Sequence, residues 1–252
     1  MELLSPGNPA LNRKTFADVI PLQQTDTMSV SGTLNRFVVL TILAFGSAAY
    51  VWKLSTNQTP VLWWWLGGFA GSLIVSIIIG FKPKLAPFLS PIYALFTGLF
   101  LGGISTYYNF RFEKIAPNLI INAVGLTFGV LVAMFALYNL RVIKATKKLQ
   151  SVIFVSMAGI GIYYLLTVVL GSFFGIQMPL VYDSSPLGII FSLIIVAVAS
   201  LKLIIDFDLI DQGTSAGAPK FMEWYCAFGL LMTVVWLYVE ILRLLSKVAS
   251  RR

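Results

Sequence analysis

The chain has 252 residues and a net charge of +8; 58% of its residues are hydrophobic and only 11% are charged. Because charged residues make up about a quarter of a typical soluble domain, this composition excludes a soluble globular protein. The single cysteine, Cys226, excludes an internal disulfide. The absence of histidine excludes the common Cys/His zinc sites and acid–base catalysis by histidine.

The N-terminal segment 1–33 is polar and is interrupted by Pro6, Pro9 and Pro21. It has no apolar core followed by a cleavage site, so it does not resemble a signal peptide, and we expect a flexible cytoplasmic tail. A transmembrane domain over 34–248 and a short basic tail over 249–252 follow. Apolar runs of about 20 residues, long enough to cross a bilayer, predict seven spans at 34–52, 61–80, 88–106, 118–139, 152–173, 187–208 and 221–245.

Positive charge in short loops indicates which side of a membrane protein faces the cytoplasm. With seven spans, ten basic residues fall on the side of the N-terminus and three on the other side, before the C-terminal tail is counted. This predicts a cytoplasmic N-terminus. The tail opposes the count, because it places Arg243, Lys247, Arg251 and Arg252 on the outer side. The alternative is that one segment does not cross fully.

Glycines four residues apart recur in the predicted spans, as in the pairs Gly98/Gly102 and Gly125/Gly129. Small residues at this spacing let helix backbones approach closely in a membrane. We interpret these pairs as packing positions within the helix bundle and not as a signal for dimerisation.

Several classes of enzyme are excluded by missing motifs. The chain has no G-x-S-x-G nucleophile elbow and no phosphate-binding loop of the G-x-x-x-x-G-K-[ST] type. A retinal protein would need a lysine deep in the last span, whereas Lys247 lies at its end. We therefore expect no enzymatic activity, no cofactor, no resident metal and no nucleic-acid partner, and the lipid bilayer as the surroundings.

A long apolar run ends with Asp206, Asp208 and Asp211, and Lys202 lies one turn before them. Ionisable groups at membrane depth are costly and indicate function by default. Counted from Pro186, Asp206 lies about 30 Å along a helix, near the edge of the hydrocarbon. One interpretation is an acidic helix end in the headgroup region. The other is a functional cluster in which Lys202 pairs with Asp206 at i, i+4.

The last third of the chain, LKLIIDFDLIDQGTSAGAPKFMEWYCAFGLLMTVVWLYVEILRLLSK, resembles the Bax-inhibitor family of membrane proteins in its bacterial YccA-like branch. The segments NPALNRKTF, MSVSGTLNR and SPIYALFTGLFLGGIS are similar to the same branch, so the resemblance covers nearly the whole chain. It implies an all-α membrane fold of seven transmembrane helices, six of them around a central last helix, in the bacterial inner (plasma) membrane. It also implies a pH-sensitive calcium leak, in which two aspartates on the last two helices share a proton and close the cytoplasmic side.

Asp206 matches the first of these two aspartates, whereas the second position falls near Met232 or Thr233, neither of which is acidic. A pair that shares a proton needs two carboxylates in close contact, so this departure matters. The acids that remain near Asp206 in the sequence pattern are Asp208, Asp211 and Glu223.

Glu240 is a further acid on the last span. If the last two spans are antiparallel, Asp206 should lie level with Cys226, and Glu240 should lie about 21 Å deeper, too far to replace the missing partner. Two roles are then open for Glu240. It forms an i, i+3 ion pair with Arg243 near the far interface, or it is an acid at the other mouth of a pore.

Two functions are predicted as alternatives. The first is a calcium leak gated by protonation of an acidic cluster, with Glu240 and Arg243 at the second pore mouth. The proton-sensitive gate would comprise Asp206, Asp208, Asp211 and Lys202. The second is a non-transporting protein that modulates a membrane-bound protease, a role associated with YccA-like relatives, through its polar N-terminal tail. The direction of the Asp206 side chain, into the bundle or out toward the headgroups, distinguishes the two.

Overall fold

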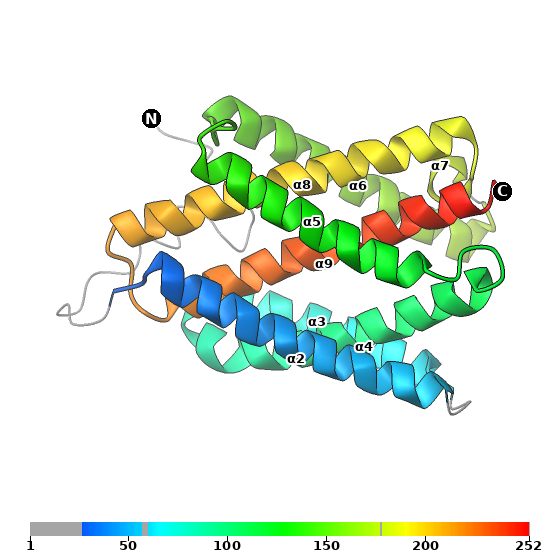
Figure 1. Ribbon diagram of the computed structural model, residues 1–252, viewed down its shortest axis with the longest axis horizontal. Coiled ribbons are helices and arrows are strands. Elements are labelled where there is room, and N and C mark those ends of the chain that lie inside the picture. Colours follow the sequence, from blue (N-terminus) through cyan, green and yellow to red (C-terminus); the bar gives the residue numbers. More distant parts are fainter. Residues whose placement is uncertain (1–26, 57–59, 177, 252) are drawn as a thin grey trace. The chain divides into compact units, whose positions relative to one another are not determined.

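The computed structural model describes residues 27–56, 60–176 and 178–251 (Figure 1). In these segments the chain is helical between its connectors, and seven helices are long and apolar enough to cross a membrane. This confirms the predicted all-α membrane fold with seven spans. These helices are α2 (Val30–Thr56), α3 (Leu62–Phe81), α4 (Ala86–Phe112), α5 (Leu119–Asn139), α6 (Lys147–Phe174), α8 (Pro186–Ser215) and α9 (Met222–Ala249).

The helices extend beyond the apolar runs from which the spans were predicted. The helix α8 continues to Ser215 instead of ending near residue 208, so the three aspartates lie inside it. The helix α2 begins at Val30, within the predicted tail 1–33, of which residues 1–26 lie outside the described part of the chain. Hydropathy marks the part of a helix that meets hydrocarbon, whereas the backbone hydrogen bonds continue into polar turns. Two short helices in connectors, η1 (Pro83–Leu85) and α7 (Pro179–Tyr182), were not predicted.

Local sequence explains where α6 and α7 begin and end. The Thr146 side chain accepts a hydrogen bond from the backbone N–H of Leu149, so it caps the first turn of α6. Gly175 ends α6 in the left-handed conformation, with φ of 67°, where glycine carries no steric penalty. Pro179 occupies the first turn of α7, where a missing backbone N–H removes no helical hydrogen bond.

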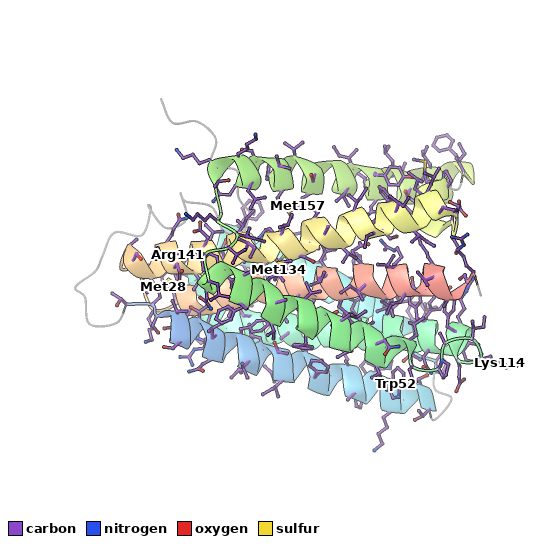
Figure 2. The ribbon with its side chains drawn as sticks, turned by 45° about the horizontal axis from the view of Figure 1, so that its top comes forward. Met28, Trp52, Lys114, Met134, Arg141 and Met157 are labelled. Carbon is purple, nitrogen blue, oxygen red and sulfur yellow. The ribbon has the colours of Figure 1, made fainter. Side chains whose placement is uncertain are left out.

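The chain forms two compact units. The first unit comprises Met1–Tyr107 and Asp206–Val235, and the second comprises Tyr108–Ile205 and Trp236–Arg252. The long helices α8 and α9 each contribute one part to each unit. In Figure 2, Met28 and Trp52 mark the two ends of α2 in the first unit, and Lys114 and Arg141 mark the two ends of α5 in the second.

The glycine pair Gly98/Gly102 lets two helices of the first unit pack closely. A Cβ added at Gly98 would lie 2.1 Å from the carbonyl oxygen of Ala44, and one at Gly102 would lie 2.7 Å from that of Ala48. Glycine therefore lets α4 approach the backbone of α2, as predicted. The prediction was wrong for Gly125 and Gly129 on α5, because nothing among the described residues lies within 4 Å of a Cβ at either position.

The last two helices are the most enclosed spans. The apolar window of α9 is 61% buried and that of α8 is 56% buried, against 11% for α6. The outward faces of the less buried helices consist of large apolar side chains such as Val155, Leu165 and Ile121, which suits contact with lipid chains. Among the described residues, the buried acidic and basic side chains all lie on α8 and α9, and they define the candidate site.

Candidate functional site

Five acidic or basic side chains on the last two helices are buried, each with at most 4% of its surface exposed. A charged side chain at the centre of a membrane helix costs on the order of 3 kcal/mol even by the smaller experimental scales. Such groups are retained only where partners or function compensate. The five residues are Lys202, Asp206, Glu223, Glu240 and Lys247.

In the first unit, Asp206 on α8 contacts Thr233 on α9. The Thr233 hydroxyl donates a hydrogen bond to Oδ2 of Asp206 at 2.6 Å. Asp206 is 1% exposed, so its side chain points into the packed helices and not toward headgroups. The buried side chain rules out the interpretation of Asp206 as an exposed acidic helix end.

This contact corrects the predicted register of the last two spans. Asp206 lies level with Thr233 and not with Cys226, seven residues earlier on α9. The error arose because α8 continues to Ser215 before the chain turns back, which moves the turn along the sequence. Thr233 is therefore found where the resemblance places a second aspartate near Met232 or Thr233.

The other aspartates of the predicted cluster lie in different environments. Asp208 is half-buried and accepts a hydrogen bond from the Gln212 side chain, whereas Asp211 is exposed. Residues two and five positions after Asp206 point to other faces of a helix, so the three acids do not form one buried set. Lys202 is buried one turn before Asp206 on α8, and its pairing with that carboxylate stays a prediction.

Glu223, at the start of α9, binds the start of α2 in the first unit. Its Oε1 accepts hydrogen bonds from the backbone N–H and the hydroxyl of Ser29, both at 3.1 Å. Lys220 lies 3.5 Å from Oε1 and Arg36 lies 3.9 Å from Oε2. A Cβ at Gly32 would lie only 2.0 Å from Oε1. Glu223, predicted to be available near Asp206, therefore holds the beginning of the first span.

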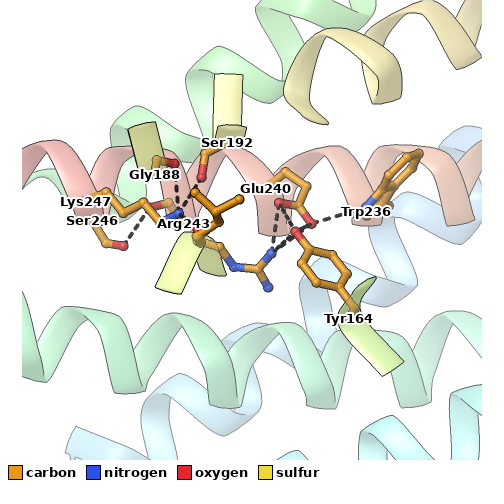
Figure 3. A network of polar contacts seen from close by, with 9 residues as sticks. Tyr164, Gly188, Ser192, Trp236, Glu240, Arg243, Ser246 and Lys247 are labelled. Atoms are coloured by element: carbon orange, nitrogen blue, oxygen red, sulfur yellow. Dashed lines mark hydrogen bonds and ion pairs between the residues drawn. The ribbon is translucent and has the colours of Figure 1, made fainter. Parts of the chain in front are cut away.

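In the second unit, Glu240 is the centre of a network of polar side chains (Figure 3). The Tyr164 hydroxyl on α6 lies 3.0 Å from both of its carboxylate oxygens, and Trp236 Nε1 donates to Oε1 at 3.3 Å. Arg243 Nη1 lies 2.9 Å from Oε2 and 3.0 Å from Oε1. Arg243 also donates to the Tyr164 hydroxyl and lies over its ring, 4.8 Å from the centroid.

The Glu240–Arg243 ion pair that the i, i+3 spacing predicts is present. The pair does not lie at the exposed interface that was expected, because the Glu240 side chain is only 2% exposed and the Arg243 side chain 22%. Three donor groups converge on one carboxylate, so its lone pairs are largely used within the protein. The arrangement is that of a fixed counter-charge. The role of Glu240 and Arg243 at a pore mouth stays a prediction.

Lys247, one turn after Arg243, is also buried in the second unit (Figure 3). Its ammonium group donates to the carbonyl oxygen of Leu180 at 2.7 Å, to that of Gly188 at 3.0 Å and to the Ser192 hydroxyl at 2.8 Å. An ammonium has three donors, and all three are used. Lys247 was expected only as a lysine at the end of the last span.

Part of this site could have been found from sequence. Trp236, Glu240, Arg243 and Lys247 follow one another at spacings of four, three and four residues, which places them on one face of a helix. No such signal identifies their partners Tyr164 and Ser192, because each is one of several hydroxyl-bearing residues in its helix and nothing in the sequence singles it out.

Comparison with known proteins assigns the chain to a family. The family model described as Bax inhibitor 1 like matches residues 8–250, which include all seven spans and all five buried acidic or basic residues. Neither the curated proteins nor the solved structures give a significant match. Since the match covers nearly the whole sequence, the chain belongs to the Bax inhibitor 1 like family of membrane proteins.

Proposed function

We propose that this protein is a cation leak, with calcium as the transported ion, whose closed state depends on the protonation of Asp206. The proposal rests on one observation above all: a buried carboxylate on α8 is held by a neutral hydroxyl on α9, Thr233. It includes a location in a bacterial inner membrane with the N-terminus in the cytoplasm, and no enzymatic activity.

The physical basis is that the Asp206–Thr233 contact differs between the two charge states. An ionised carboxylate accepts a strong, short hydrogen bond from a hydroxyl, but it also bears the full desolvation cost of a buried charge. A neutral carboxyl avoids most of the desolvation cost and forms a hydrogen bond of roughly half the strength. Protonation therefore changes the free energy of the α8–α9 contact, and with it the population of the closed state.

Among the groups near Asp206, the thiol of Cys226 on α9 interacts with it electrostatically, and Lys202 lies one turn before it on α8. The family resemblance implies two aspartates that share a proton, whereas this chain has Thr233 where the second is expected. Thr233 does not titrate, so the Asp206–Thr233 contact itself contains one carboxylate. A coupled pair would titrate in two steps.

Calcium would be cargo in this proposal and not a resident ion. In the described part of the chain, no group of three or more acidic, cysteine or histidine side chains lies together to hold a metal. A tight calcium site takes six to eight oxygen ligands, several of them carboxylates. A leak instead needs sites weak enough to release the ion.

The test is calcium flux into liposomes loaded with a calcium-sensitive dye, measured from about pH 5 to 8, the range in which a perturbed carboxylate changes charge. Wild-type protein should show a pH-dependent flux, and Asp206→Asn should lose most of that dependence while the protein stays folded. Asp211→Asn is the matched control, because Asp211 is exposed on the same helix. An unchanged pH profile in Asp206→Asn would reject the gate.

The alternative is a non-transporting protein that modulates a membrane-bound protease. It is supported by the way the chain enters its first span: the Met28 N–H donates to the carbonyl oxygen of Ala218 at 2.8 Å, and Ser29 binds Glu223. These contacts hold Met28 and Ser29 against the segment around Ala218 and Glu223 within the first unit. Absence of flux in wild-type liposomes, together with co-purification of a membrane protease that depends on residues 1–26, would favour this function.

A further inference from the structure

The ammonium of Lys247 sits among three oxygen atoms that carry no net charge. They belong to the Leu180 carbonyl, the Gly188 carbonyl and the Ser192 hydroxyl, at 2.7, 3.0 and 2.8 Å. Among the described residues, no carboxylate lies within ion-pair distance of this ammonium. The direct hydrogen-bond partners of this buried positive charge are therefore neutral oxygens, all within the second unit.

Oxygen dipoles that converge on one point form the kind of environment in which a monovalent metal cation is bound. Backbone carbonyl oxygens replace the water shell of such ions in selective channels. Divalent ions, in contrast, are bound with the help of carboxylates, and Ca²⁺ takes six to eight oxygen ligands. The set around Lys247 has two carbonyls, one hydroxyl and no carboxylate, so its chemistry suits a single positive charge.

The cage is built by the local fold and does not depend on Lys247 alone. The helix α7 has four residues, so the Leu180 carbonyl belongs to its last turn and lacks a helical partner. Ser192 lies one turn after Gly188 on the same face of α8. A Cβ at Gly188 would lie 2.2 Å from the carbonyl oxygen of Asp183, so glycine is needed where the α7–α8 connector packs.

Charges near the cage act on a cation in both directions. Arg243 repels the ammonium of Lys247, whereas Glu240 and Asp183 attract it. Glu240 binds Arg243, Tyr164 and Trp236 directly and forms no ion pair with Lys247. Asp183 in the connector interacts electrostatically with Lys247. The hydroxyl and backbone N–H of Ser185 hold the pKa of Asp183 below its usual range, so this carboxylate is negative at neutral pH.

We propose that Lys247 is a tethered cation that occupies a binding site for a monovalent metal ion such as Na⁺ or K⁺. The side chain fills the site permanently, holds α7 and the start of α8 against α9, and prevents free ions from entering. Removal of the ammonium opens a site that takes a free monovalent cation. This inference does not depend on whether the protein leaks calcium.

The experiment compares the melting temperature of purified Lys247→Ala with that of the wild type, in NaCl or KCl and in N-methylglucamine chloride at the same ionic strength. N-methylglucamine is too large for the cage, so it controls for general salt effects. At ten times the dissociation constant, a bound ion should raise the Tm of Lys247→Ala by about 3 °C in a protein of this size. The wild-type Tm should not distinguish the salts.

Two further variants separate an ion site from a simple loss of hydrogen bonds. Lys247→Met keeps an unbranched side chain that fills the space without charge, so it should not respond to Na⁺ or K⁺. Adding Ser192→Ala to Lys247→Ala removes one ligand and should reduce the ion-dependent shift by at least half.

Three results would overturn the proposal. One is a Tm of Lys247→Ala that is the same in all salts, and a second is an equal response of Lys247→Met. The third is a Lys247→Ala protein that cannot be isolated folded even in high NaCl, KCl or ammonium chloride, because a cage that accepts free cations should be rescued by one of them.

Discussion

Asp206 in the first unit and Glu240 in the second are both buried carboxylates on the last two spans, but their partners differ. The hydrogen bond shown for Asp206 comes from the neutral Thr233 hydroxyl, whereas Glu240 binds the Arg243 guanidinium, the Tyr164 hydroxyl and the Trp236 indole. A buried carboxylate that loses a cation partner is left with an uncompensated charge, whereas one that loses a neutral donor loses one hydrogen bond. The two contacts therefore differ in the stability that their removal should cost.

The largest expected effect comes from removing the charge partner of Glu240. Arg243→Ala leaves a buried carboxylate without its cation, which should lower the free energy of unfolding by about 3–5 kcal/mol. This is well above the roughly 0.3–0.5 kcal/mol of an exposed ion pair. Thermal unfolding in detergent would measure it. The double variant Glu240→Gln/Arg243→Gln should recover part of the loss, and a loss as small as that of a surface pair would show that Glu240 is not a fixed counter-charge.

A smaller loss is expected at the hydroxyl that holds Asp206. Thr233→Val keeps the shape of the side chain but leaves a buried carboxylate oxygen without this donor. The free energy of unfolding should fall by about 1–3 kcal/mol. Thr233→Asp instead restores two facing acids, so the pH response of calcium flux should spread into two steps. A flux profile that is identical in Thr233→Asp and wild type would argue against control of the gate by this contact.

Two glycine substitutions on α2 test the contact of Glu223, the other buried acid of the first unit. Gly32→Ala places a methyl group only 2.0 Å from Glu223 Oε1, so the Glu223 carboxylate must move away from Ser29. This displacement should lower the free energy of unfolding by about 1–3 kcal/mol. Gly46→Ala on the same helix meets nothing within 4 Å and should be neutral or slightly stabilising. Equal effects of the two substitutions on thermal unfolding would show that the Glu223–Ser29 contact is not tightly packed.

The smallest effect is expected for Asp183, which is fully exposed. Its pKa is lowered mainly by the Ser185 hydroxyl, so its ionised form favours the folded state above its unfolded pKa, and this contribution is lost as pH falls through the folded value. Asp183→Asn should therefore lower stability slightly at neutral pH and leave it unchanged at strongly acidic pH. Melting temperatures of wild type and Asp183→Asn, measured from neutral to strongly acidic pH, would show this difference. A larger loss at acidic than at neutral pH would contradict the prediction.

The spans could be predicted from sequence because apolar length reports membrane thickness directly, and Asp206 stood out because an acid in such a run is rare. The contacts of these residues could not be predicted as well. The level of Asp206 relative to α9 depends on where α8 ends, and the polar residues up to Ser215 give no apolar signal. Tyr164 and Ser192 acquire their roles only through neighbours on other helices, which one sequence does not encode as a pattern.

The central claim is that the protonation of Asp206 changes with pH. Infrared difference spectra of the protein in liposomes, recorded between about pH 5 and 8, measure this through the carbonyl band of a protonated carboxyl group. The account predicts a band that appears at the acidic end in wild type and in Glu240→Gln and disappears in Asp206→Asn. A band that survives in Asp206→Asn and is lost in Glu240→Gln would contradict it.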